Sequence, residues 1–173
     1  LALLSGALLT SCSDSFLQRD SLTESSSNTF WQTPDDALMA LASCYDALQS
    51  NQLYNSDQYS LGPLYMDCIS DNGGSGWMEG YDMAMGIHTP SSSIIGSYWK
   101  DCYEVISRCN VLIANIDRVD MDASQKAIYQ AEAKTIRALM YINLTMTYQD
   151  VPFLTAPLTI DEAECEKTDR AAI

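Results

Sequence analysis

Two long segments with helical periodicity, joined by only a few residues, constrain the fold of this chain most strongly. From about Ser97 to Asp117, and again from 123 to about Tyr148, apolar residues recur every three or four positions, as on one face of a helix. The residues expected to face the core are Trp99, Cys102, Tyr103, Ile106, Asn110 and Ile113, then Ile128, Thr135, Ile136, Leu139 and Leu144. Asp122 with Gln125 is typical of a capped helix start, and Pro152 cannot continue a helix. The two segments therefore predict a helical hairpin.

A further helix is predicted before the hairpin. Thr33 can cap its start, Pro34 suits the first helical position, and two aspartates follow at the positive end of the helix dipole. The apolar positions that follow at helical spacing are Leu38, Leu41, Ala42, Tyr45 and Leu48. Asn51 is a plausible stop. Helical hairpins are the unit of tetratricopeptide-like arrays, so we predict an all-α, tetratricopeptide-like fold.

A long insertion separates the first helix from the hairpin, and it contains the candidate ligand site. Residues 51–96 are predicted to be irregular and hold most of the glycines. A ligand that has both apolar faces and hydroxyl groups can bind to flat aromatic rings with amides and carboxylates beside them, and this stretch supplies Asp71, Asn72, Trp77 and Tyr81. These four are the predicted ligand-binding residues. The alternative is an ordinary surface loop whose Trp77 only covers the core.

Composition and charge exclude several functions. The chain has 9 basic and 23 acidic residues, a formal net charge of -14, which argues against nucleic acid as a partner. No phosphate-binding glycine loop is present, and we expect neither a metal nor a cofactor. His88 is the single histidine and has no catalytic motif around it, so no catalytic residue is predicted.

The N-terminal residues indicate export. Leu1 to Leu9 is apolar and too short to span a bilayer, which fits the hydrophobic part of a signal peptide; a buried N-terminal helix is the alternative. Leu9-Thr10-Ser11-Cys12 resembles the lipobox of bacterial lipoproteins, in which the cysteine is lipidated. We therefore expect a signal-peptide remnant at 1–11 and a lipidated, Ser/Thr/Asn-rich tether at 12–32. If Cys12 carries lipid, five cysteines remain, and Cys102 and Cys109 are interpreted as small buried hydrophobes.

Several motifs, in order along the chain, resemble those of the SusD/RagB family. They are Cys12-Ser13-Asp14-Ser15-Phe16-Leu17, Phe30-Trp31-x-Thr33-x-x-Asp36-Ala37, Trp99-x-x-x-Tyr103-x-x-Ile106-x-Arg108-x-Asn110, Ala131-Glu132-Ala133-x-x-x-Arg137-Ala138-x-x-Tyr141-x-x-Leu144 and Tyr148-Gln149-Asp150-Val151-Pro152. In the last motif Gln149 stands where the family usually has glycine. Family members are also substantially longer, so residues 33–173 are expected to form the N-terminal part of a SusD-like helical domain.

The resemblance carries functional expectations. It implies a glycan-binding lipoprotein without catalytic activity, anchored in the outer membrane and exposed at the cell surface, that works with a TonB-dependent transporter. The alternative is a scaffold or truncated assembly lipoprotein that binds no glycan. Glu132 and Arg137 are expected to make separate structural contacts rather than to form a catalytic pair.

The anchor assignment can be tested at Cys12. Replacing Cys12 by Ala in an expressing bacterium removes the acceptor sulfur for lipid, and a protein without acyl chains lacks stable membrane attachment. We expect the variant to move from the membrane fraction to the soluble fraction, as followed by immunoblotting. If variant and parent fractionate alike, Cys12 is not the anchor.

Overall fold

The computed structural model describes residues 30–55, 62–68, 70–76, 78–159, 162 and 164–173. The chain divides into two units, Leu1–Phe30 and Trp31–Ile173, and the following concerns the second. Cys12, the predicted signal-peptide remnant and most of the predicted tether lie outside the described residues, as does Trp77. The predicted division into signal remnant, tether and helical domain stays a prediction.

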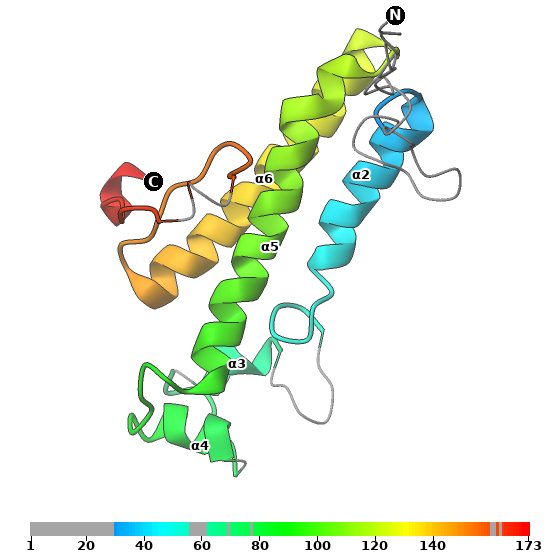
Figure 1. Cartoon of the computed structure of the whole chain (residues 1–173). Helices are drawn as coiled ribbons and strands as arrows, with labels where there is room; N and C mark the ends of the chain where they lie inside the picture. The colour runs from blue at the N-terminus through cyan, green and yellow to red at the C-terminus, as the bar shows by residue number, and fades with distance from the viewer. Residues whose placement is uncertain (1–29, 56–61, 69, 77, 160–161, 163) are drawn as a thin grey trace, which may run out of the picture. The chain divides into compact units, whose positions relative to one another are not determined.

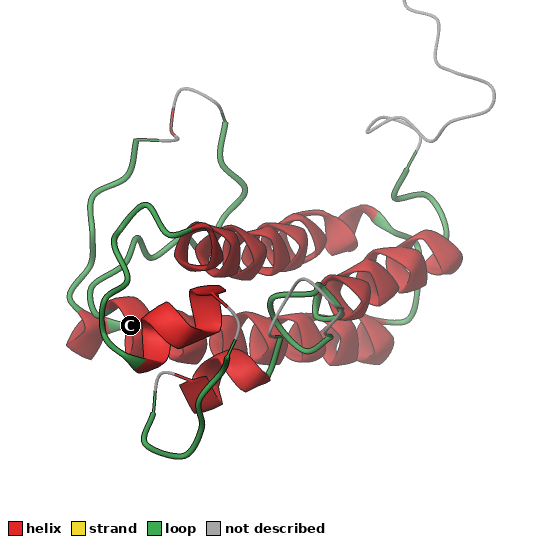
Figure 2. Ribbon diagram, turned by 90° about the horizontal axis from the view of Figure 1, so that it is seen from below, coloured by secondary structure: helices red, strands yellow, loops and turns green. Residues whose placement is uncertain are grey.

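Three helices form the body of this unit, and the predicted all-α fold is confirmed. They are α2 (Pro34–Ala47), α5 (Ser93–Asn115) and α6 (Ala123–Tyr148). The short 3-10 helix η1 (Ile116–Arg118) helps to reverse the chain between α5 and α6, which pack side by side as the predicted hairpin (Figure 1). Helix α2 contacts both of them (Figure 2). Among the described residues, the sole β feature is an isolated antiparallel bridge between Val151 and Thr168.

The two predicted helix caps, Thr33 and Asp122, are confirmed in atomic detail. Thr33 caps α2: its hydroxyl accepts from the Asp36 N–H at 3.3 Å, and the Asp36 carboxylate accepts from the Thr33 N–H at 2.7 Å. The hydrogen bonds that the Asp36 carboxylate accepts, first the one from the Thr33 N–H and then the one from the Thr33 hydroxyl at 2.9 Å, lower the pKa of Asp36. At α6, the Asp122 carboxylate accepts from the N–H groups of Ser124 and Gln125 at 2.9 and 3.1 Å.

Other helix boundaries differ from prediction. Helix α2 ends at Ala47 rather than near Asn51, and α5 begins at Ser93, about one turn earlier than expected. The predicted irregular insertion contains two short helices, α3 (Leu64–Cys68) and α4 (Met78–Ala84). Both are too short to produce a clear periodic pattern, which is why the sequence did not indicate them. After Pro152 the described residues are mostly irregular, and the exceptions include η3 (Arg170–Ala172) and the bridge residue Thr168.

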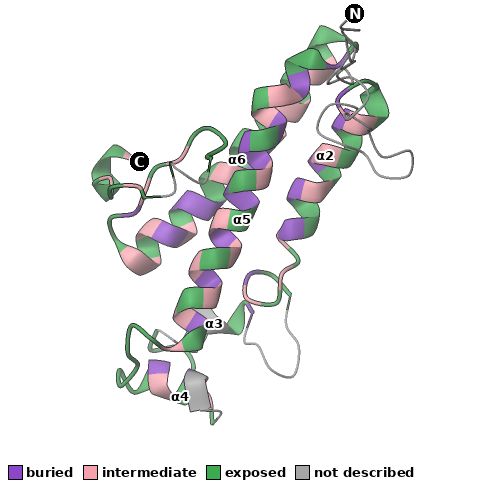
Figure 3. Ribbon diagram, viewed as in Figure 1, coloured by how far each residue is buried: buried purple, intermediate pink, exposed green. Residues whose placement is uncertain are grey.

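The core lies between the facing sides of α2, α5 and α6 (Figure 3). The largest fully buried apolar side chains are Ile106, Leu112, Ile116, Met140, Leu144, Val105, Val119 and Val151. Cys102, Ile106, Asn110, Ile136 and Leu144 are buried as predicted. The sequence prediction missed Tyr98, Val105, Leu112, Ala133 and Met140.

Several predicted core residues are instead exposed. Leu38, Tyr45, Ile128 and Leu139 are 50%, 45%, 49% and 37% exposed. Helix α6 has apolar residues on more than one face, and α2 and α5 cover only one of them. The uncovered side borders an apolar groove of about 700 Å³ between α2 and α6, lined by Tyr45, Leu48, Ile128, Ala131, Glu132, Thr135, Ile136, Ala138, Leu139 and Ile142.

Gln149 ends α6 with a backbone conformation that favours glycine. Its φ is 67°, and its N–H still donates to the Thr145 carbonyl at 3.2 Å. A side chain at positive φ is strained, whereas glycine is not. Gln149 replaces the expected glycine, but the backbone at this position keeps a conformation that glycine would adopt without strain.

We expect Gln149→Gly to raise the free energy of unfolding by up to about 1 kcal/mol, because it relieves this strain. The matched control is Gln149→Ala, which keeps the strain and, like the glycine variant, loses the hydrogen bond from Arg170 to the Gln149 side chain. Urea unfolding followed by circular dichroism measures both. A glycine variant no more stable than the alanine variant would contradict this account.

Candidate functional site

Two of the predicted ligand residues, Asp71 and Asn72, lie in an ordered turn that follows α3. The Ser70 hydroxyl donates to the Asp67 carbonyl at 3.0 Å and accepts from the Asn72 N–H at 3.2 Å. Gly73 packs closely against Asp67: a Cβ added at Gly73 would lie 2.9 Å from the Asp67 Cβ. A larger residue at position 73 would therefore force Asp67 or the turn to shift. The side chains of Asp71 and Asn72 remain exposed, one amide and one carboxylate side by side at the surface.

The third predicted residue, Tyr81, lies on α4, and its side chain is 47% exposed. Among the described residues, no hydrogen bond joins Asp71, Asn72 and Tyr81. The structure places the exposed side chains of these three residues at the surface of the insertion. They remain predicted ligand residues, as does Trp77.

The structure also contains a cleft that the sequence did not indicate. It has a volume of about 470 Å³ and is lined by Met83, His88, Pro90, Ile95, Met146, Thr147 and Tyr148. These residues come from the end of α4, the segment before α5, the start of α5 and the end of α6. The cleft offers apolar side chains, the His88 imidazole and a tyrosine ring in one concave surface, which is a suitable combination for a small polar ligand with apolar faces.

An aromatic cluster supports one wall of this cleft. The Tyr148 ring meets the Trp99 ring edge-on at 5.0 Å between centroids, and Trp99 packs on Tyr103 at 4.9 Å. The Tyr148 hydroxyl donates to the Ile95 carbonyl at 2.6 Å, which ties the end of α6 to the start of α5. Because both its ring and its hydroxyl are held, Tyr148 is a rigid part of the cleft.

The described residues offer little for metal chemistry or membrane crossing. They contain no group of three or more His, Cys, Asp or Glu side chains that could hold a metal ion. Within the same part of the chain, none of the helices combines the length and apolar character that crossing a bilayer requires.

Known proteins match this chain both in sequence and in structure. The SusD-like protein P25 of Formosa agariphila is 31% identical over 161 residues, which are 88% of this chain and 30% of that protein. P38 of the same organism, also SusD-like, is 31% identical over 94% of this chain and 31% of its own length. A solved laminarin-binding SusD-like protein superimposes with a TM-score of 0.70 at 29% identity, covering 82% of this chain and 31% of that one. The chain belongs to the SusD-like family.

A second solved SusD-like protein, a carbohydrate-binding protein from Bacteroides fragilis, agrees with this assignment. It has a TM-score of 0.70 at 27% identity over 83% of this chain and 29% of its own. No model of a protein family matches the sequence. The chain spans about 30% of the length of the SusD-like relatives it matches in sequence.

In this SusD-like chain, the motif residues on α5 and α6 hold the extended segment 152–156 against the hairpin. The buried Asn110 side chain donates from Nδ2 to the carbonyls of Leu154 and Ala156 at 3.1 and 3.2 Å, and its Oδ1 accepts from Arg137 Nη1 at 2.6 Å. Arg137 Nη1 also donates to the Thr155 carbonyl at 3.1 Å. We call residues 152–156 the strap.

Two tyrosines complete the hold on the strap. The Tyr103 hydroxyl donates to the Pro152 carbonyl at 2.8 Å. The Tyr141 hydroxyl donates to the Leu154 carbonyl at 3.0 Å and accepts from the Leu154 N–H at 2.6 Å. Burial raises the pKa of both phenols, so they remain neutral donors at physiological pH.

The predicted separate roles of Glu132 and Arg137 are confirmed. Glu132 Oε2 accepts from the Tyr45 hydroxyl at 2.8 Å, which links α6 to α2. Arg137 serves Asn110 and the strap instead. The two charged side chains therefore make different contacts.

We expect Asn110→Leu to lower the free energy of unfolding by about 2–4 kcal/mol, because it leaves strap carbonyls and one Arg137 donor without their partner. Ser107→Ala, at an exposed position of α5, is the matched control and should change stability little. Urea unfolding measures both variants. Equal stabilities for the two would show that the strap does not depend on Asn110.

Proposed function

We propose that this chain is the N-terminal part of a glycan-binding lipoprotein that is anchored in the outer membrane through Cys12 and faces the cell exterior. In this proposal it binds polysaccharide or oligosaccharide without cleaving it, and passes it to a TonB-dependent transporter. The observation that carries the proposal is the match over most of this chain to SusD-like proteins, among them a laminarin-binding and a carbohydrate-binding one.

The surface of the insertion supports a binding role. Asp71 and Asn72 present hydrogen-bonding groups in an ordered turn, Tyr81 presents a partly exposed ring, and Trp77 is close to them in sequence. Sugars are bound by stacking on aromatic rings and by hydrogen bonds from amides and carboxylates to hydroxyl groups. The cleft lined by His88 and Tyr148 gives the same region a concave surface.

The absence of catalysis belongs to the same proposal. Glu132, which could act as an acid in a catalytic pair, accepts a hydrogen bond from Tyr45, and Arg137 is engaged with Asn110. A glycosidase of the common type needs two carboxyl groups across one glycosidic bond. Two solved proteins that resemble this chain are a laminarin-binding and a carbohydrate-binding SusD-like protein.

One observation favours the second candidate, a scaffold that binds no glycan. The apolar groove between α2 and α6 leaves Ile128, Leu139 and Ile142 partly exposed, and exposed apolar patches often mark protein contacts. A scaffold would keep this surface but would show no affinity for glycans.

We expect Trp77→Ala to lower glycan affinity about tenfold or more with no loss of helix content, because stacking on an aromatic anchor contributes about 1–2 kcal/mol. Affinity electrophoresis against a panel of polysaccharides that includes laminarin measures the affinity, and circular dichroism measures the helix content. Tyr81→Ala should weaken retardation in the same way.

Phe153→Ala is the matched aromatic control. Phe153 is 41% exposed and packs edge-on against Tyr141 at 5.0 Å, in the strap rather than in the insertion. Phe153→Ala should lower the melting temperature slightly and leave the retardation of the protein by glycans unchanged. If Trp77→Ala lowers the melting temperature and leaves retardation unchanged, as this control should, Trp77 belongs to the core. If no glycan retards either this chain or a full-length relative that carries the segment, the scaffold is the better account of the function.

A further inference from the structure

A groove follows one side of α6 and, among the described residues, shares no lining residue with the cleft described above. It has a volume of about 250 Å³, and six of its lining residues belong to α6, from Lys134 to Thr145. The others are Phe153 of the strap, Arg170 and Ile173. Because each helical residue advances about 1.5 Å, the α6 side of the groove extends over about 16 Å. The groove is therefore long enough for an extended ligand.

Three cationic side chains line this groove, and no acidic side chain of the described residues does. They are Lys134, Arg137 and Arg170. The chain has 9 basic and 23 acidic residues, so these three are a third of its cations. A surface of average composition would instead carry more acidic than basic groups. The groove is thus a local positive surface on a protein whose net charge is strongly negative.

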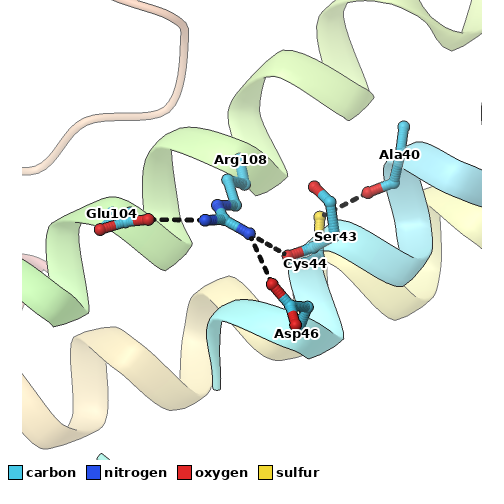
Figure 4. A network of polar contacts seen from close by, with 6 residues as sticks. All are labelled: Ala40, Ser43, Cys44, Asp46, Glu104 and Arg108. Atoms are coloured by element: carbon cyan, nitrogen blue, oxygen red, sulfur yellow. Dashed lines mark hydrogen bonds and ion pairs between the residues drawn. The ribbon is translucent and has the colours of Figure 1, made fainter. Parts of the chain in front are cut away.

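These three cations lack the carboxylate partners that neutralise Arg108. Arg108 forms ion pairs with Asp46 at 3.2 Å and with Glu104 at 2.6 Å. It also donates to the Ser43 carbonyl at 2.9 Å, so its charge serves the packing of α5 on α2 (Figure 4). Among the described residues, the ion pairs all involve Arg108. The positive charges along the groove are therefore not balanced by side chains of this part of the protein.

Arg137 is the anchored cation of the groove. Its Nη1 donates to the Asn110 amide oxygen at 2.6 Å and to the Thr155 carbonyl at 3.1 Å. Both acceptors are neutral, and its other N–H groups have no acceptor among the described residues. The planar guanidinium matches the oxygen atoms of a carboxylate or of a similar oxyanion. Arg137 therefore keeps both its charge and some of its donors for an acidic ligand.

Lys134 and Arg170 add exposed cations to the groove. Lys134 lies about one turn before Arg137 on α6, and its ammonium has no partner in the part of the chain that the structure describes. The Arg170 side chain donates to the Gln149 amide oxygen, and its backbone N–H donates to the Asp150 carboxylate at 3.1 Å. These two hydrogen bonds attach the segment around Arg170 to the end of α6, so cations from two distant parts of the sequence line one groove.

We propose that this groove binds the charged groups of an acidic oligosaccharide, one whose sugars carry carboxylate or sulfate groups. The inference rests on the proposed function, because it takes the ligand of this surface to be a glycan. Cations spread along a groove suit a chain with repeated anionic groups, whereas one small anion would need them to converge on a single point. The insertion would then bind sugar rings and hydroxyl groups, and the groove would select for charge. Because Phe153 borders the groove, Phe153→Ala is a control for the insertion with uncharged glycans such as laminarin.

The first test compares two ligands that differ in charge alone. Oligomers of galacturonic acid carry a carboxylate on each sugar, and their methyl esters carry none. Isothermal titration calorimetry with the full chain at low salt should show that the ester binds about tenfold more weakly or worse. Affinity for the acid should also fall as salt is added, because salt screens exposed charges. Equal affinities for acid and ester would overturn the proposal, and this comparison needs no variant.

The same comparison is made with a sulfated galactan and its unsulfated form. Tighter binding of the sulfated form, with or without binding of galacturonate, supports the groove and identifies sulfate as a charge that it accepts. Inorganic sulfate is titrated beside them. If inorganic sulfate binds as tightly as the sulfated galactan, the groove is a site for small anions and the oligosaccharide assignment is wrong.

The second test locates the binding on the protein. Lys134→Gln with Arg170→Gln removes two exposed cations from the groove and should lower the affinity for the acidic oligosaccharide about tenfold or more, with an unchanged circular dichroism spectrum. Lys100→Gln with Lys167→Gln is the matched control, because it removes two exposed cations that do not line the groove. This control should change the affinity less than about twofold. An equal loss in both double variants would show that net charge, and not the groove, determines binding.

Two further ligands separate this inference from its alternative and from the proposed function. If poly-aspartate binds more tightly than every acidic oligosaccharide, the groove receives an acidic protein segment instead. Laminarin carries no charge and reports on the proposed function alone. Retardation by laminarin without binding of any acidic oligosaccharide would overturn this inference and leave the proposed function intact. If no glycan of either kind binds, both are wrong.

Discussion

The side chain of Asn110 is the interaction on which the arrangement of α5, α6 and the strap depends. The strap has no helical hydrogen bonds of its own, so its backbone carbonyls need partners when they lie against the hairpin. Asn110 supplies two of these partners and also accepts from Arg137, so one buried amide connects three elements. Being polar and 2% exposed, it is acceptable in the core only because these groups are all paired. The same hydrogen bonds fix the position of the strap along the hairpin.

The same network gives a physical reason for the spacing of the motif residues in this chain. Asn110 and Tyr103 lie two turns apart on α5, and Arg137 and Tyr141 lie one turn apart on α6, so each pair faces the strap from one side. Arg108 lies on a neighbouring part of α5 and faces α2 instead. The motif on α5 thus joins the hairpin to the chain segments on both sides of it.

Much of the fold could be predicted from the sequence, because helices and their caps depend on residues close together in the chain. Thr33, Pro34 and Asp122 indicated two helix starts correctly. Periodicity could not decide which apolar face of α6 is covered: Ile128 and Leu139 are exposed, while Ala133 and Met140 are buried. Which face is covered depends on where α2 and α5 pack, and this is set by contacts between residues far apart in the sequence.

The candidate site, like the fold, could be predicted from the sequence only in part. The residue types in the insertion indicated a surface suited to sugars, but the cleft could not be foreseen, because it combines Met83 and His88 of the insertion with Tyr148 at the distant end of α6. The Tyr148 hydroxyl holds the ends of α5 and α6 together, and the Trp99 ring supports it. The hairpin is therefore the supporting part of the region, and the exposed side chains of the insertion are the ones that can vary without disturbing the core. In the proposed function, therefore, the motifs that resemble those of SusD-like proteins belong to the scaffold, and the choice of glycan would depend on residues of the insertion such as Asp71, Asn72 and Tyr81.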